Sequence, residues 1–239
     1  MPKARRRFAC LIIVAVLAAA AIIAFFILRT RFTGPESRSV SPANRQRIAQ
    51  LSLSRTRQSG KVMTGRIGNA AWIDGFPCAA GWVHFSESGR LTAFFSDEPV
   101  IIQGNQIPKG TWIKLNADSA LASCFFPEDT TIQGYTCRGS VGGAEGVATG
   151  FYPSGRLSAF FPRNDTMVGG IPCKASSFSA VYLHENGNLK QCMVTREVAF
   201  GGRTLSEGET VHMDGEGNIQ SVSEPSWFTR AGNWVKKLL

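Results

Sequence analysis

The side chains of this 239-residue chain that could do chemistry are three histidines and six cysteines. His84, His184 and His212 stand far apart in the sequence, and no two cysteines form the CxxC spacing of a structural zinc site. No nucleophile elbow, Ser-His-Asp spacing or metal motif occurs. Because an enzyme needs convergent titratable groups, we predict a non-enzymatic protein with no catalytic residues, metal or cofactor.

The cysteines beyond residue 70 suggest disulfide chemistry. Cys124 and Cys137 form one candidate pair, Cys173 and Cys192 form a second, and Cys78 is left over. Disulfides persist in oxidising compartments, and matched pairs of this kind indicate bridges there. The alternative is that these residues are buried free thiols that fill small sites in a core.

A turn that recurs at near-constant spacing must position these side chains. The turn position steps by 29, 30, 36, 32 and 30 residues, and a period in this range marks a repeat array. Six residues occupy it: Gly60, Gly89, Ser119, Gly155, Gly187 and Gly217. The glycines supply the positive φ that a hairpin turn needs. An array of small units presents an extended surface rather than one deep cleft.

Apolar residues flank each turn with the period of two that is typical of a half-buried strand. Around Gly89 they are Val83, Phe85 and Leu91, with a polar or variable residue between the first two. A second glycine follows each turn by 15 residues: Gly75, Gly104, Gly134, Gly170 and Gly202. We therefore predict units of two to three short strands in an all-β, antiparallel array of hairpins, either a meander or a solenoid.

Two features of the repeat bear on binding and on the cysteines. The third unit is longer by about six residues, which fall in residues 138–146. We interpret this insertion as a flexible glycine loop, with a loop on a binding face as the alternative. The cysteines occupy two repeat positions, 5 and 18 residues after the turn, and equivalent positions should stack or pair along the array.

The turn blocks at residues 85–91, 151–157 and 182–189 share an aromatic or apolar residue, a Ser-Gly or Asn-Gly turn and a leucine. This pattern resembles the core of MORN-variant repeats, which include the bacterial proteins called YwqK-type antitoxins. The resemblance covers residues 58–222, although the period here is longer than is usual in that family and Ser119 replaces one glycine. It implies an elongated β-hairpin array used for protein or membrane contacts.

The amino-terminal region contains a candidate membrane anchor. Residues 8–28, which include Cys10, carry no charge, and 21 residues at ~1.5 Å each span a hydrocarbon core of roughly 30 Å. A cleavable signal peptide is the alternative, but the apolar run is longer than usual for one. Basic residues on both sides favour a signal-anchor with a cytoplasmic amino terminus and a periplasmic or extracellular repeat domain at the inner or plasma membrane.

The net charge of +9 is unevenly distributed. Residues 1–61 hold 12 basic residues and one acid, whereas residues 62–224 hold 11 basic and 16 acidic residues, a net charge of −5. A mildly acidic array argues against nucleic acid as a partner. The basic ends are suited to anionic lipid near the bilayer, or they fix topology and are solvated.

The chain ends in a second candidate helix. Its apolar face comprises Trp227, Phe228, Ala231, Trp234, Val235 and Leu238. Lys236 and Lys237 lie opposite or beside that face. Such a helix suits a membrane interface or a partner protein. Alternatively, it caps the open edge of the last repeat.

These observations divide the chain into five predicted parts. They are a basic tail (1–7), a transmembrane helix (8–28), a basic juxtamembrane stalk (29–58), a β-repeat domain of about five units (59–222) and an amphipathic helix (223–239). The leading hypothesis is a membrane-anchored scaffold or accessory subunit of an integral membrane protein complex. The alternatives are a cytoplasmic antitoxin-like protein or an envelope module that binds a glycan, peptide or lipid headgroup through Trp82, Trp112 and Tyr182.

Overall fold

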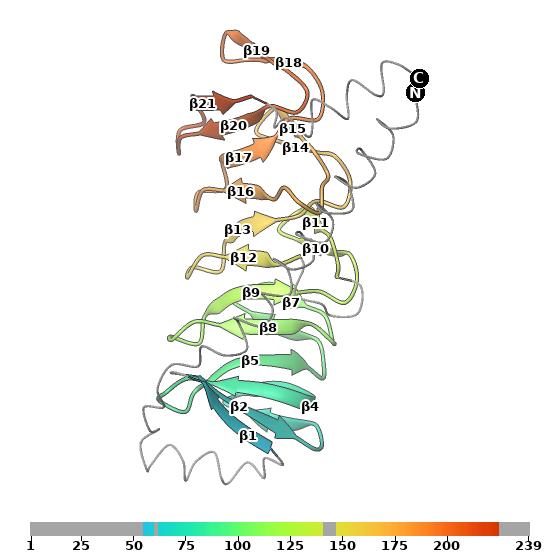
Figure 1. Ribbon diagram of the computed structural model, residues 1–239, viewed down its shortest axis with the longest axis vertical. Coiled ribbons are helices and arrows are strands. Elements are labelled where there is room, and N and C mark those ends of the chain that lie inside the picture. Colours follow the sequence, from blue (N-terminus) through green and yellow to red (C-terminus); the bar gives the residue numbers. More distant parts are fainter. Residues whose placement is uncertain (1–54, 60–61, 141–146, 225–239) are drawn as a thin grey trace, which may run out of the picture.

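The structure is a computed structural model that describes residues 55–59, 62–140 and 147–224. These ranges contain 21 β-strands and no helix (Figure 1). Thirteen strands form one long antiparallel sheet, and the other eight form four separate two-stranded hairpins. The all-β, antiparallel hairpin array predicted from the turn spacing is confirmed for this part of the chain.

The long sheet runs through twelve strands in sequence order. They are β1 (Arg55–Ser59), β2 (Val62–Ile67), β4 (Phe76–Phe85), β5 (Leu91–Ser96), β8 (Trp112–Leu115), β9 (Leu121–Phe125), β12 (Thr149–Phe151), β13 (Leu157–Phe160), β16 (Val181–Leu183), β17 (Leu189–Met193), β20 (Thr210–Met213) and β21 (Ile219–Ser223). The thirteenth strand, β3 (Ala71–Ile73), pairs with the start of β4. The sheet therefore begins at Arg55, inside the segment predicted as stalk.

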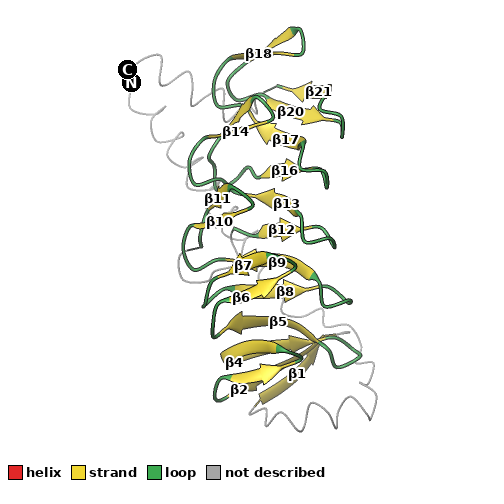
Figure 2. Cartoon of the chain, turned by 180° about the vertical axis from the view of Figure 1, so that it is seen from behind, coloured by secondary structure: helices red, strands yellow, loops and turns green. Residues whose placement is uncertain are grey.

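The separate hairpins form a column beside the sheet (Figure 2). They are β6 (Val100–Ile102) with β7 (Asn105–Ile107), β10 (Thr130–Ile132) with β11 (Tyr135–Cys137), β14 (Thr166–Val168) with β15 (Ile171–Cys173), and β18 (Val198–Phe200) with β19 (Arg203–Leu205). Each unit thus has four strands rather than the predicted two to three, because three-residue strands are too short to show a periodicity.

The turns of the long hairpins behave as their glycines predict. The described turn residues all have positive φ: Gly89 (77°), Ser119 (61°), Gly155 (83°), Gly187 (91°) and Gly217 (90°). In the first of these turns, the Ser86 N–H donates to the Arg90 carbonyl at 2.8 Å, and the Gly89 N–H donates to the Ser86 carbonyl at 2.9 Å. The same two bonds recur in each later turn, so the strands of every unit leave their turn in the same register.

The short hairpins have two-residue turns in which both residues take positive φ. In the β6–β7 turn, φ is 49° at Gln103 and 78° at Gly104, which is the type I′ geometry that suits the twist of a hairpin. In this turn and in those of β3–β4 and β10–β11, the first turn residue carries a side chain that reaches the long sheet. The Gln103 Oε1 atom accepts a hydrogen bond from the Leu121 N–H at 2.9 Å, so this tip is held against the start of β9.

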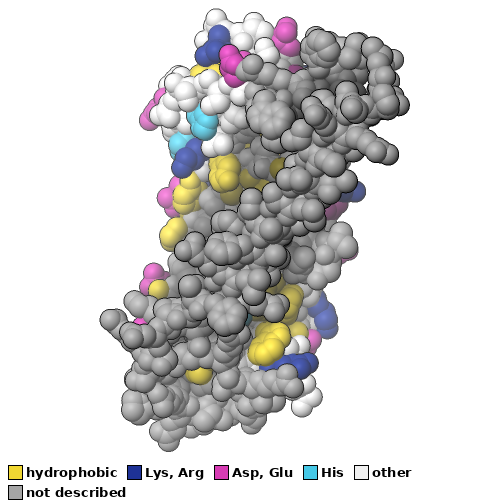
Figure 3. All heavy atoms as spheres, in the orientation of Figure 1, with side chains coloured by type: hydrophobic (Ala, Val, Ile, Leu, Met, Phe, Trp, Pro, Cys, Tyr) yellow, Lys and Arg dark blue, Asp and Glu magenta, His cyan; other side chains and the backbone are white. Residues whose placement is uncertain are grey.

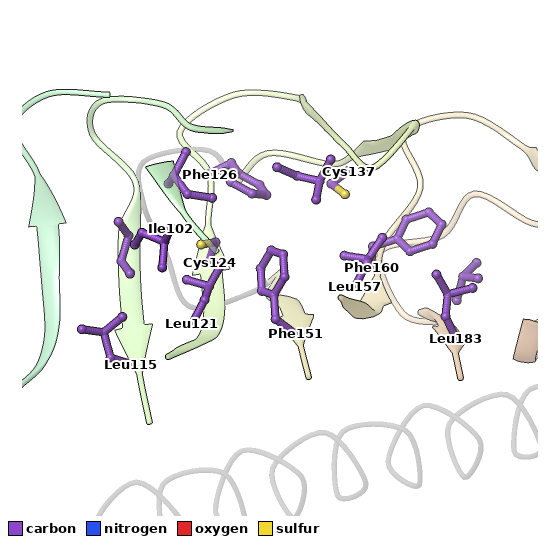
Figure 4. Close-up of a cluster of buried hydrophobic side chains, with 14 of the residues drawn as sticks. Ile102, Leu115, Leu121, Cys124, Phe126, Cys137, Phe151, Leu157, Phe160 and Leu183 are labelled. Carbon is purple, nitrogen blue, oxygen red and sulfur yellow. The ribbon is translucent and has the colours of Figure 1, made fainter. Parts of the chain in front are cut away.

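The core lies between the long sheet and the column of hairpins. It contains the apolar residues that flank each turn, for example Val83 (0% exposed), Phe85 (1%) and Leu91 (1%). Figure 4 shows part of this core, where Leu121, Phe151 and the neighbouring leucines point into one cluster. Each unit leaves one face of its strands open, so only stacking on the next unit completes the core.

The predicted helices lie outside the described residues, except that Ser223, predicted to begin the carboxyl-terminal helix, is instead the last residue of β21 because it pairs with Thr210. The proposed membrane span at residues 8–28 lies outside them, as do Trp227, Phe228, Trp234, Lys236 and Lys237 at the carboxyl end. Among the residues that the structure describes, no helix is long and apolar enough to cross a membrane.

Candidate interaction surfaces

A row of exposed side chains runs along the outer face of the hairpin column and continues onto β3, which pairs with β4 of the long sheet. The central residue of each first hairpin strand points outward: Trp72, Ile101, Thr131, Met167 and Ala199. Trp72 is 67% exposed, Ile101 68% and Met167 51%. We call these five residues the hairpin row. Three of these five equivalent positions thus present a large apolar side chain on one face, and apolar surface gathered on one face is where soluble proteins bind other molecules.

A groove of about 500 Å³ opens beside the hairpin row. Its walls come from two neighbouring units, with Pro99, Val100 and Ile101 on one side and Thr130 and Thr131 on the other. Gln106, Ile107 and Pro108 complete the lining. The groove is mostly apolar with a few polar groups, which is the usual character of a small-ligand site.

The opposite face of the long sheet carries a second apolar cluster, in its amino-terminal half. Phe95, Trp112 and Phe125 pack together from the neighbouring strands β5, β8 and β9, and Trp82 stands on the same face of β4; we call these four residues the aromatic ladder. The rings of Phe95 and Trp112 have centroids 4.6 Å apart. Ala93 and Ala148 complete the cluster.

Two basic or titratable side chains border the aromatic ladder. The ring of His84 meets that of Trp112 edge-on, with centroids 5.2 Å apart, and the Lys114 Nζ atom lies 5.0 Å from the centre of the Phe125 ring. A cation over an aromatic face is attracted by the ring quadrupole. His84 and His212 occupy equivalent positions near opposite ends of the described array, consistent with their spacing in the sequence.

The three aromatic residues predicted to face a ligand do not share one exposed surface. Trp82 and Tyr182 are 43% and 41% exposed, but Trp112 is only 6% exposed. Trp82 and Trp112 belong to the aromatic ladder, whereas Tyr182 lies in β16. Phe95 and Phe125 were not predicted as site residues, although both stand six residues after a turn, and that shared repeat position is the signal that could have found them.

Which cysteines come together depends on how the strands of neighbouring units pair. Cys173 and Cys192 form a disulfide with a Cα–Cα distance of 5.6 Å, as predicted. Cys124 and Cys137, the other predicted pair, are buried free thiols, as is Cys78. A cysteine 18 residues after a turn pairs through its backbone with the next unit. Cys137 forms an isolated antiparallel β-bridge with Pro162, and Cys173 forms one with Val194. The prediction for Cys124 and Cys137 is wrong because both belong to the same unit; Figure 4 shows Cys137 on the side of Phe160.

The free thiols are held in their neutral form. Burial raises the pKa of Cys78 and of Cys137 to about 12, and for Cys137 the nearby Thr149 hydroxyl opposes part of that rise. Burial also raises the pKa of Cys124. The reactive form of cysteine is the thiolate, so these residues are inert fillers of the core rather than nucleophiles. The described residues include no cluster of metal-binding side chains.

Acidic side chains are spread along the edge formed by the long-hairpin turns. Glu87, Asp118, Glu185 and Glu216 are all exposed there, and Figure 3 shows acidic groups along one side of the molecule and hydrophobic groups at several levels of the array. These four carboxylates are part of the negative charge that the sequence assigns to the repeat domain.

Comparison with protein-family models and with curated protein sequences returns no match for this chain. The resemblance to MORN-variant repeats therefore stays a prediction based on the turn blocks.

Proposed function

We propose that this chain is a membrane-anchored scaffold or accessory subunit, and that its β array binds another protein of a membrane complex through the hairpin row. The observation that carries the proposal is the exposure of Trp72, Ile101 and Met167 at three of five equivalent positions along one face. Two sheet strands per unit, each about 4.8 Å from the next, give a step of about 10 Å along that face. An extended array with apolar side chains at such steps suits a partner that lies along it.

The location belongs to the same proposal. The uncharged segment at residues 8–28 supports an anchor, and the disulfide between Cys173 and Cys192 supports a domain in an oxidising compartment. The side of the membrane is tested with Thr131→Cys, because Thr131 is exposed whereas Cys78 is buried. A membrane-impermeant maleimide should label this variant on intact cells. Labelling only after lysis would contradict the orientation and favour the cytoplasmic, antitoxin-like alternative.

The interaction is tested by purifying the full-length protein from membranes after crosslinking in cells. The variant Trp72→Ser, Ile101→Ser, Met167→Ser should lose at least four-fifths of the partner recovered with the unaltered chain. The matched control, Thr131→Ser with Ala199→Ser, changes the same row at its smaller residues and should retain the partner. If the unaltered chain returns only itself and lipid, the proposal fails. Thermal unfolding of each variant confirms that the array is intact.

A second candidate function is the binding of an envelope ligand, and the groove between the β6–β7 and β10–β11 hairpins favours it. Its apolar walls suit an apolar peptide better than a charged headgroup. Thr131→Trp would fill the groove, whereas Ala199→Trp places the same ring on a hairpin outside it. Saturation-transfer NMR with a mixture of apolar tetrapeptides should give a signal that Thr131→Trp removes and Ala199→Trp leaves. A signal unaffected by Thr131→Trp would rule out this site.

A further inference from the structure

The aromatic ladder is an apolar surface on the side of the sheet away from the hairpins. The core residues Val83, Phe94 and Ile113 alternate along their strands with Trp82, Phe95 and Trp112. Successive side chains of a strand point to opposite faces, so the ladder and the core lie on opposite sides of the sheet. The described hairpins contribute Ile102, Ile107 and Ile132 to the core side only.

We propose that the segment leading into β1, residues 41–54, docks on the aromatic ladder through Ile48, Leu51 and Leu53. The strand register places the beginning of β1 level with the near end of the ladder. Arg55, the first residue of β1, pairs with Arg66, and Arg66 pairs with Trp82, the first member of the ladder. The described chain therefore begins at the level of Trp82.

The segment before β1 starts nearer to the ladder than the other terminal segment does. Four strand spacings separate β1 from β8, about 19 Å. Ile48 stands seven residues before Arg55, which is ~10 Å along a helix and ~23 Å along an extended chain, so Ile48 reaches β8 when the segment is extended. The carboxyl-terminal residues 225–239 begin after β21, six spacings or about 29 Å from β9, whereas β1 lies only two spacings or about 10 Å from β4, so residues 41–54 start much nearer to the ladder.

The chemistry also fits an aliphatic occupant. Trp82, at the end nearest β1, is 43% exposed and offers the open apolar surface, whereas Trp112 and Phe125 are each only 6% exposed. Burying branched aliphatic side chains against aromatic rings is favourable at about 25 cal/mol per Å² of apolar surface. Docking of this segment would hold the array close to the membrane anchor and fix its orientation, rather than let it swing on a free stalk.

The inference is tested in the full-length protein with a benzophenone amino acid in place of Phe95, and separately in place of Trp82, whose replacement leaves the core untouched. Irradiation should join either position to a peptide from residues 41–54. The same group in place of Tyr182, on the same face but three units away, should give no such product. Crosslinks to lipid, to residues 225–239, to a second copy of the chain or to another protein would each overturn the proposal.

A pair of charge variants provides the second arm of the test. Leu51→Glu with Leu53→Glu should lower the crosslink yield at least fivefold, because two carboxylates would have to be desolvated against the aromatic rings. Ser52→Glu with Ser54→Glu adds the same charge to the same segment and should leave most of the product. Equal yields from the two variants would show that Leu51 and Leu53 do not make the contact.

Discussion

The amide oxygen of Gln133 accepts a hydrogen bond from the backbone N–H of Leu157 at 3.1 Å, although 24 residues separate them. The amide nitrogen of Gln133 donates to Asn105 Oδ1 and to the Gly155 carbonyl, both at 2.9 Å, and Asn105 donates to the same carbonyl at 2.8 Å. This network joins three consecutive units between the sheet and the hairpins. It makes the middle of the array a cooperative block rather than a stack of independent units.

Removing Asn105 should destabilise this block. Asn105 is 5% exposed, and Asn105→Ala leaves buried polar partners without one of their bonds, so the free energy of unfolding should fall by about 1–3 kcal/mol. Gln106→Ala, an exposed change in the same strand, should have little effect. Chemical denaturation of both variants checks the expectation, and equal midpoints would show that the network contributes nothing.

Gly155→Ala should cost more than Gly187→Ala. Both residues have positive φ, 83° and 91°, so each alanine carries the left-handed penalty of about 1–2 kcal/mol. At Gly155 the new Cβ would also lie 2.6 Å from the Cβ of Gln103, whereas Gly187 has no atom within 4 Å. We expect Gly155→Ala to lower the melting temperature further. A larger loss at Gly187 would mean that the two layers do not meet at Gly155.

Ser119→Gly should stabilise the protein. Ser119 adopts a φ of 61° at the turn position where the other described units have glycine. Glycine relieves the left-handed strain, and the extra flexibility of the unfolded chain offsets part of this gain, which leaves about 1 kcal/mol. Thermal unfolding measures the gain. Ala117→Gly, an exposed change in the same turn, is the control and should not raise the melting temperature.

Reduction of the Cys173–Cys192 bridge should lower the free energy of unfolding by about 3 kcal/mol, the value expected for a loop of this length. The double variant Cys173→Ser, Cys192→Ser should be insensitive to reductant. Alkylation of the unreduced, unfolded protein followed by mass spectrometry should modify Cys78, Cys124 and Cys137 but neither bridged cysteine. Alkylation of Cys173 in that experiment would show that the bridge is absent.

The buried thiols should make the protein sensitive to alkaline pH. Their folded pKa values are raised by burial, to about 12 for Cys78 and Cys137, against about 8.5 in an unfolded chain. Their contribution is therefore complete below pH ~8.5 and is lost as the pH rises toward 12, by up to ~1.4 kcal/mol per pH unit for each thiol.

Cys137→Ala should consequently flatten the decline in unfolding free energy between pH 8.5 and 10 by about 2 kcal/mol, whatever its effect at neutral pH. Urea midpoints at the two pH values provide the measurement. Ser123→Ala, which leaves every thiol in place, should decline as steeply as the unaltered chain. Parallel declines for Cys137→Ala and the unaltered chain would show that this thiol is not protected from ionisation.

The repeat and its hairpins could be predicted from residue order because the rules involved are local. A positive φ at Gly89 and alternating apolar residues at Val83 and Phe85 depend on only a few neighbours. The short hairpins were less visible, since strands of three residues such as β6 show no period. Their type I′ turns, in contrast, were marked by Gly104 and its equivalents.

Contacts between units were decided only by the tertiary structure. Cys124, Cys137, Cys173 and Cys192 stand at two repeat positions of the sequence. The strand register between successive units determined that Cys173 forms a disulfide with Cys192, whereas Cys124 and Cys137 remain free thiols. The aromatic ladder arises for the same reason, because its rings come from four strands that pair across the sheet. Local patterns set the form of each unit, whereas long-range strand pairing set which side chains share a surface.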